Sequence, residues 1–153
     1  MSAADSVKAI LVADTGAGGA ATLLTGGIYT YAETGRNGIN SRSTPSAFDT
    51  TTRKLKPCAV IKERARIVDG AILDVGAQKT SYTQVVEIYL YVDGDDDKAV
   101  LYNAAARCYK LLHGKNITEG RLHWQHAVVN ERDESLNMAH MCRFDFTLFG
   151  IQT

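Results

Sequence analysis

The sequence of 153 residues lacks the features typical of disulfide-linked, nucleic-acid-binding, membrane-spanning and secreted proteins. Its three cysteines, Cys58, Cys108 and Cys142, lie far apart without C-x-x-C spacing, which predicts reduced, packed thiols of a cytosolic protein. Its 17 basic residues are balanced by 17 acidic ones, which argues against a free-standing nucleic-acid binder. No apolar run approaches the roughly 20 residues that span a bilayer. The N-terminus also lacks the basic start and apolar core of a signal peptide.

What the sequence does contain fits one domain. The hydrophobic fraction of 45% and the charged fraction of 22% are ordinary for a soluble globular protein. A chain of this length buries roughly two-thirds of the surface that its unfolded form exposes, enough for one good core. No internal repeat is present, so we predict a single domain over residues 1–153.

Two stretches have the spacing of amphipathic helices. Asp5 follows Ser2 as in a capping box, and apolar residues at helical spacing predict a helix over Ala3–Ala13. Residues 96–113 carry a continuous apolar stripe and end near a glycine. A short turn of helix is expected within residues 17–24.

Alternating residues predict the strands. The long stretch 82–92 has one mainly aliphatic face for the helices, while the other face carries Tyr89 and Tyr91, which suits a half-wet or intersubunit surface. The other predicted strands are 28–31, 58–67 and 71–75 joined at Asp69-Gly70, and 121–128 and 138–149. The simplest arrangement is an α+β fold: an antiparallel sheet of four to five strands with two helices packed on one face.

A long loop follows the first strand. Residues 32–56 are rich in Ser, Thr, Gly and Asn, and a structureless loop of this length is unusual in a compact domain. The loop is either a mobile arm or a segment ordered on a neighbouring subunit, with Ile39, Phe48 and Leu55 as its anchors. Its basic residues fit contact with DNA or acidic neighbours as well as ordinary solvated charge. They are Arg36, Arg42, Arg53 and Lys54.

Catalytic and metal-binding patterns are weak. In the acidic turn of residues 93–97 the glycine is not at the position that an EF-hand loop requires, and no glutamate occupies the twelfth loop position. Helix capping is therefore favoured over calcium binding. His123 and His126 are three apart, which on a regular strand places them on opposite faces and disfavours a metal site that includes His140. Cys142 shares a strand face with His140, but no orienting partner is identifiable. No catalytic residue, cofactor or metal site is predicted.

The order of elements resembles that of the tail terminator or tail-completion proteins of long-tailed bacteriophages. The resemblance rests on the opening Val-Lys-Ala-Ile-Leu-Val-Ala-Asp helix, the Gly-Gly-Ile-Tyr step into the first strand, the strand of residues 83–92, the helix of residues 96–113 and a terminal hairpin. It covers nearly the whole chain but includes no diagnostic motif. The extended segment 32–56 departs from the family pattern.

This resemblance implies a non-enzymatic virion protein at the head–tail junction, assembled in the host cytoplasm. A homo-hexameric ring would cap the tail tube, end its growth and join tail to head. Its partners would be its own copies, tail-tube protein, a head-closure or connector protein, and non-specific DNA in the ring lumen, with no membrane. Another neck component, such as a head-closure protein, is the alternative. A small cytosolic α+β enzyme or ligand-binding protein that uses the histidines or Cys142 is the alternative from a different class.

Overall fold

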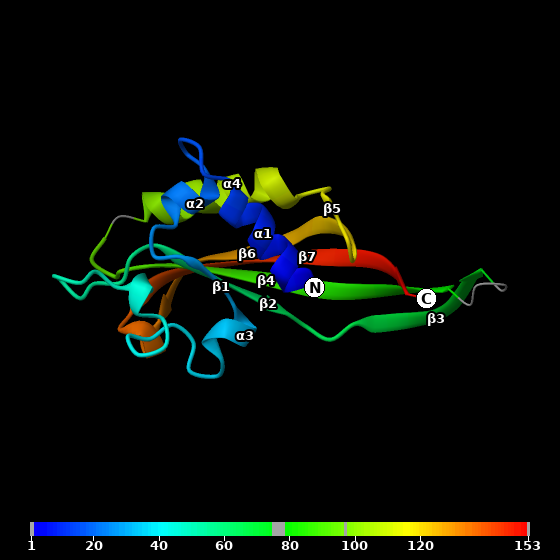
Figure 1. The fold of residues 1–153 in the computed structure, drawn as a ribbon, viewed down its shortest axis with the longest axis horizontal. Coiled ribbons are helices and arrows are strands. Elements are labelled where there is room, and N and C mark those ends of the chain that lie inside the picture. The colour runs from blue at the N-terminus through cyan, green and yellow to red at the C-terminus, as the bar shows by residue number, and fades with distance from the viewer. Residues whose placement is uncertain (1, 75–78, 97, 153) are drawn as a thin grey trace.

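A twisted sheet forms the middle of the protein (Figure 1). The computed structural model describes residues 2–74, 79–96 and 98–152. Among these residues the strand order is β1-β2-β4-β7-β6-β5, and β3 also pairs with β4. β1 is parallel to β2, whereas the other neighbours are antiparallel. The strands are β1 Ile28–Thr30, β2 Cys58–Glu63, β3 Ile67–Asp74, β4 Lys79–Val92, β5 Asn116–Ile117, β6 Gly120–Asp133 and β7 Ala139–Gln152.

Helices lie on both sides of this sheet. Helices α1, α2 and α4 cover one face, which we call the helical face, and α3 lies beneath the opposite, open face (Figure 1). The helices are α1 Ala3–Ala13, α2 Ala20–Leu23, α3 Tyr31–Thr34 and α4 Ala99–Leu112. The predicted capping box is confirmed, because the Asp5 N–H donates to Ser2 Oγ and the Ser2 N–H donates to the Asp5 carboxylate, both at 3.1 Å.

The predicted fold class is wrong. The fold is mixed α/β, with a curled sheet of seven strands, one parallel strand pair and four α-helices in the described part of the chain. The elements β5 and α3, which were not predicted, have only two and four residues, too few to reveal a strand or helix period in the sequence. The parallel pair needs a crossover connection, and the segment between β1 and β2 supplies it.

The hairpin predicted at Asp69-Gly70 is also wrong. β3 continues through these two residues, and β2 and β3 both pair with β4 rather than with each other. The register of β3 against β4 shifts between Val68 and Ile72, so the glycine signal marks an irregularity within a strand. Val75, the end of the predicted return strand, lies outside the described residues.

The main core lies between the sheet and the helical face. The alternation predicted for residues 82–92 is confirmed, because the predicted helix-facing residues of β4 are buried. The amphipathic stripe of α4 is confirmed as well, with four of its residues buried. The largest fully buried side chains include Phe144 and Phe146 of β7. The buried residues that β4 and α4 contribute to this main core are Tyr82, Val86, Ile88, Leu90, Val92, Leu101, Ala104, Cys108 and Leu112.

The segment of residues 32–56 packs against the open face of its own chain. It contains α3, a 3-10 turn at Pro45–Ala47 and a bridge between Phe48 and Leu55. Its apolar residues join β2 and β4 in a second hydrophobic cluster, where the side chains of Ile39 and Leu55 are buried. The segment is therefore ordered on its own subunit, and a contact with a neighbouring copy stays a prediction.

An ion pair joins the helices across the helical face. Arg107 of α4 donates from Nε and Nη2 to the two carboxylate oxygens of Asp14, at 2.7 and 2.8 Å. Asp14 follows α1 and also accepts the backbone N–H of Ala20 at 2.7 Å, which begins α2. The hydrogen bond from Arg107, followed by that from Ala20, lowers the pKa of Asp14 from 3.8 to about 2.

The Asp14 pair predicts an acid-sensitive component of stability. The pKa of Asp14 is lower in the folded than in the unfolded protein, so the ion pair stabilises the fold when the pH is above the unfolded-state pKa. This stabilisation is lost as the pH falls through the folded-state pKa. We expect the urea midpoint of the wild type to fall more than that of Asp14→Asn between about pH 5 and pH 2. Parallel curves for the two proteins over this range would contradict the prediction.

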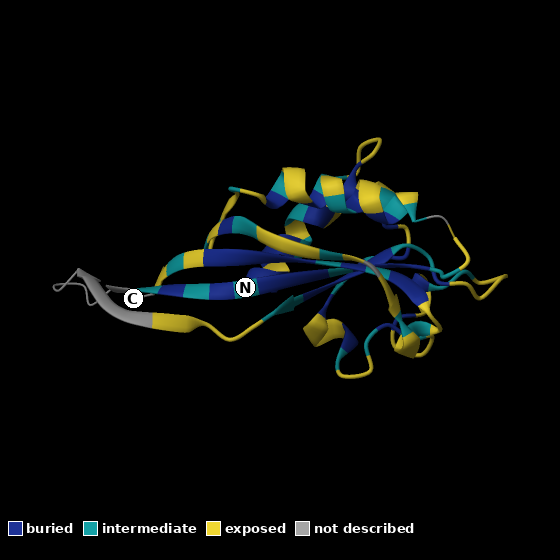
Figure 2. Cartoon of the chain, turned by 180° about the vertical axis from the view of Figure 1, so that it is seen from behind, coloured by how far each residue is buried: buried dark blue, intermediate teal, exposed yellow. Residues whose placement is uncertain are grey.

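Three strands extend beyond the helices as a projection (Figures 1 and 2). We call residues 67–74, 79–83 and 149–152 the arm. Its pairing is continuous with the sheet, since Ile67 pairs with Thr83 and Thr83 with Phe149. No helix covers the far end of this part of the sheet in Figure 1.

Candidate functional site

Four of the predicted contact residues meet at one groove on the open face. Tyr89 and Tyr91 of β4 stack with their ring centroids 6.5 Å apart. Arg36 and Ile39 approach them from the segment after α3, and together they line a cavity of about 200 Å³. Tyr91 is buried there rather than half-wet. The cavity is also lined by Tyr31, Lys62, Asp133 and Leu136.

The remaining predicted residues lie on the same segment. Phe48, Arg53 and Leu55 line a neighbouring hollow of about 230 Å³, together with the turns that follow β4 and β6. Arg42 and Lys54 are exposed. The structure thus gathers the apolar anchors of the segment and Arg53 at one end of the sheet. The buried side chains of Ile39 and Leu55 serve the fold of their own subunit.

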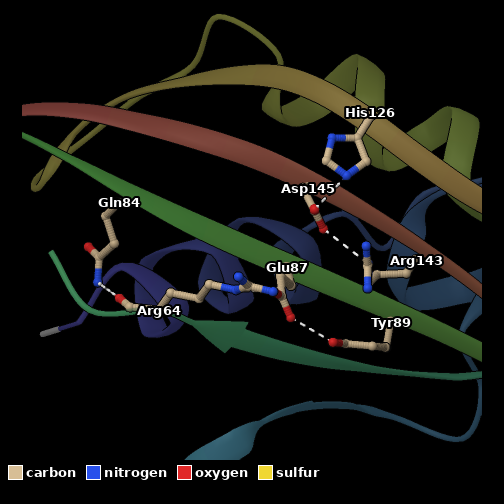
Figure 3. A network of polar contacts seen from close by, with 7 residues as sticks. All are labelled: Arg64, Gln84, Glu87, Tyr89, His126, Arg143 and Asp145. Carbon is tan, nitrogen blue, oxygen red and sulfur yellow. Dashed lines mark hydrogen bonds and ion pairs between the residues drawn. The ribbon is translucent and has the colours of Figure 1, made fainter. Parts of the chain in front are cut away.

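A polar network occupies the middle of the open face (Figure 3). Glu87 of β4 is 1% exposed although it lies between Val86 and Ile88 in a hydrophobic strand. Tyr89 Oη donates to Glu87 Oε2 at 2.6 Å, and Arg64 Nε donates to Oε1. Burial alone would raise the pKa of Glu87, but the hydrogen bonds from Tyr89 and Arg64 outweigh it and lower the pKa.

A second carboxylate stands directly across from the first. Asp145 of β7 pairs with Glu87 in the register, and both side chains are buried. His126 Nε2 lies 2.9 Å from Asp145 Oδ2, and Arg143 Nε lies 3.3 Å from Oδ1. Like charges facing each other across two strands are destabilising, so Arg64 and Arg143 are needed to offset the pair. Sequence reasoning missed this network, since a lone Glu in an alternating strand reads as a solvated residue.

The Glu87 network should contribute measurably to stability. We expect Glu87→Gln to lower the free energy of unfolding at pH 7 by about 1 kcal/mol, because the charge-assisted bonds are lost while the exposed Arg64 stays solvated. Urea denaturation would measure the change. Lys62→Gln, a change on β2 opposite Glu87, is the control and should cost less. An unchanged midpoint for Glu87→Gln would show that the network is not stabilising.

The histidines lie differently from the sequence prediction. The register of β6 shifts between Trp124 and His126, so His123 faces Thr147 and His126 faces Asp145. Because Asp145 and Thr147 are two residues apart on β7, both histidines lie on the open face, and the prediction of opposite faces is wrong. Among the described residues, no group of three or more His, Cys, Asp or Glu side chains could hold a metal ion.

The cysteines are free and buried, as predicted for packed thiols. Burial raises the pKa of Cys58 and of Cys108 to about 12, and it raises the pKa of Cys142 as well. Burial is also the main cause that lowers the pKa of His140. A thiol with a raised pKa is a poor nucleophile at neutral pH, because the thiolate is the reactive form.

The acidic turn precedes a helix that starts at Ala99, three residues later than predicted. Asp93 accepts the backbone N–H of Asp95 at 3.0 Å within the turn. Asp97 lies outside the described residues. The N-cap residue of α4 is Lys98, which makes no side-chain capping hydrogen bond, and the first turn holds no acidic residue, so the predicted capping is not seen among the described residues. Within the described ranges, no helix is long and apolar enough to cross a membrane.

Comparison with known proteins gives a likeness in fold. No protein-family model matches the chain, and no curated protein matches its sequence. Among solved structures, it is similar to a chain of the virion of the native gene transfer agent (GTA) particle, with a TM-score of 0.51 and 15% sequence identity. The likeness covers 97% of this chain and 92% of that chain. At this identity, the two chains share a fold over nearly their full lengths.

Proposed function

We propose that this chain is a structural protein of a phage-like virion. The fold shared with a chain of the gene transfer agent virion, over nearly the whole of both chains, is the observation that carries the proposal. The element order of the sequence supports it independently. The arm also presents exposed apolar side chains, which is what a protein that assembles with other subunits requires.

More specifically, we propose a tail terminator at the head–tail junction. The chain would form a ring, a homo-hexamer in the resembled family, that caps the tail tube and meets a head-closure or connector protein. Ring closure requires two different surfaces on each subunit, because a head-to-tail contact joins unlike patches. The arm and the opposite end of the sheet differ in shape and charge, which supports such a contact. The exposed Arg42 and Lys54 are candidates for contact with DNA in the lumen.

Disruption of the gene in its phage or particle would test this role. A terminator mutant is expected to produce tails of abnormal length that are not joined to heads, visible by negative-stain electron microscopy. A head-closure mutant would instead leave tails of normal length and heads that lose DNA. Gold labelling of a tagged chain along the tail or on the capsid shell, away from the junction, would contradict the junction role.

We also propose that the chain has no catalytic role. The buried Cys142 with its raised pKa supports this proposal. Alanine substitutions at His123, His126, His140 and Cys142, combined with metal analysis, would test it. Stoichiometric metal in the purified protein, or loss of virion assembly by a variant that folds normally, would favour the enzyme or ligand-binding alternative.

A further inference from the structure

The arm carries an apolar strip on its open face. Ile67, Phe149 and Ile151 are 67%, 49% and 61% exposed. Ile67 and Phe149 both pair with Thr83, and Ile151 pairs with Ser81, so the three side chains share one face of the sheet. With Val68, the arm holds four of the ten large hydrophobic side chains that are exposed among the described residues. This concentration indicates a contact surface, because scattered exposure is the usual pattern.

The rim of the arm favours docking against an acidic surface. β3 pairs only with β4 in the described part of the chain, so its outer edge is a template for further contact. Two exposed arginines, Arg64 and Arg121, stand at the base of the arm on its open face, since Arg64 donates to Glu87 and Arg121 pairs with Phe149. The Arg66 guanidinium lies over the ring of Tyr82, 4.4 Å from its centroid, and therefore on the helical side of the same strands.

A surface of complementary character lies at the opposite end of the same strands. It is the hollow of about 230 Å³ lined by Phe48, Leu55 and Leu136, with Arg53 on its wall. Met138, beside Leu136 in the same turn, is 47% exposed. Among the described residues, the turns around the hollow carry six acidic residues against the two cations Lys98 and Arg132, and Arg132 already donates to two backbone carbonyls. The acidic residues are Asp93, Asp95, Asp96, Glu131, Asp133 and Glu134.

We propose that the arm of one copy docks into this hollow on the next copy of the chain. The apolar strip would cover Phe48, Leu136 and Met138, and the arginines at the base of the arm would face the carboxylates of the two turns. The arm and the hollow are unlike surfaces at opposite ends of β4 and β7, so the contact that we propose is head-to-tail. The contact is heterologous and propagates into a ring or a filament.

The proposal deepens the ring of the proposed function and rests on it, yet it is tested separately. The arm variant is Ile67→Glu with Ile151→Glu, and the end variant is Asp95→Lys with Glu134→Lys. Val12→Glu with Val129→Glu is the matched control, because these residues are 46% and 47% exposed and lie outside both surfaces. Circular dichroism confirms folding, and Ile151→Glu alone serves if the double arm variant does not fold.

Sedimentation velocity of the purified full chain is expected to show wild type and control as oligomers larger than a dimer. Each surface variant alone should associate at least about 30-fold more weakly, as expected when a main anchor of an interface is removed. An equimolar mixture of the two variants should form dimers and nothing larger, since each mixture pair retains one intact arm and one intact hollow. This mixture distinguishes a heterologous contact from a symmetric one.

Charge complementarity is tested by reversing both ends. Arg121→Glu should weaken assembly, and its combination with the end variant should restore it. The proposal would be overturned if the arm variant formed the same oligomers as wild type. It would also be overturned if the mixture of variants formed no dimers, or if wild type stayed monomeric. An arm variant that assembles normally but no longer binds tail tubes would assign the arm to the tube instead. None of these results decides the virion role, which the gene disruption tests.

Discussion

Phe146→Ala is expected to lower the free energy of unfolding by about 4 kcal/mol, the largest loss we predict for a single substitution. Phe146 is fully buried in the main core. Its ring contacts those of Trp124 and Phe144 edge-on, with centroids 5.8 and 5.9 Å away. Truncation removes this contact area and leaves a cavity that neighbouring strands of a paired sheet cannot close.

Phe149→Ala is the matched control for this prediction. Phe149 lies on the same strand but on the open face, where it is 49% exposed and contacts His123. Its removal should cost less than about 1 kcal/mol, as is usual for surface substitutions. Urea denaturation of both variants would measure the difference. Equal losses at the two positions would show that the core does not lie on the helical face.

Gly120→Ala is expected to cost about 3 kcal/mol, for a reason that involves backbone rather than core volume. Gly120 begins β6 with a φ of +151°, a conformation that residues with a side chain rarely adopt. An added Cβ would lie 2.8 Å from the carbonyl carbon of Phe149 and closer still to its oxygen. The start of β6 would have to move away from β7 at the base of the arm.

Gly16→Ala provides the comparison for Gly120. An added Cβ at Gly16 meets no atom within 4 Å. Its effect should stay within about 0.5 kcal/mol, because neither strain nor collision arises. Thermal and urea unfolding of the two variants would test the contrast. A Gly120→Ala protein as stable as wild type would mean that the close approach of β6 to β7 is relaxed at little cost.

The elements that the sequence predicted correctly are those with a long, regular pattern. The capping box and the bounds of α1, the two faces of β4 and the apolar stripe of α4 follow from local spacing, and the structure confirms them. The antiparallel pairing of the two closing strands, β6 and β7, is likewise confirmed. Each of these signals lies within about 15 residues, the range in which periodicity carries information.

The errors arose where a neighbour in space overrides the local signal. Asp69-Gly70 is a strong turn signal, yet β4 pairs on both sides of it and holds β3 as one strand. The shift in β6 turned His126 to the same face as His123, which no regular alternation predicts. The Glu87–Asp145 pair joins residues 58 positions apart in the chain and depends on the register of β4 against β7.

The sequence by itself determined the main helices, the long central strand and the closing hairpin, because these depend on the order and periodicity of nearby residues. Only the tertiary structure decided the seven-stranded sheet of the described residues, the packing of residues 32–56 on their own subunit, and the separation of an apolar arm from a hollow that acidic turns flank. These features depend on strand register and on contacts between distant segments, which one-dimensional patterns do not encode.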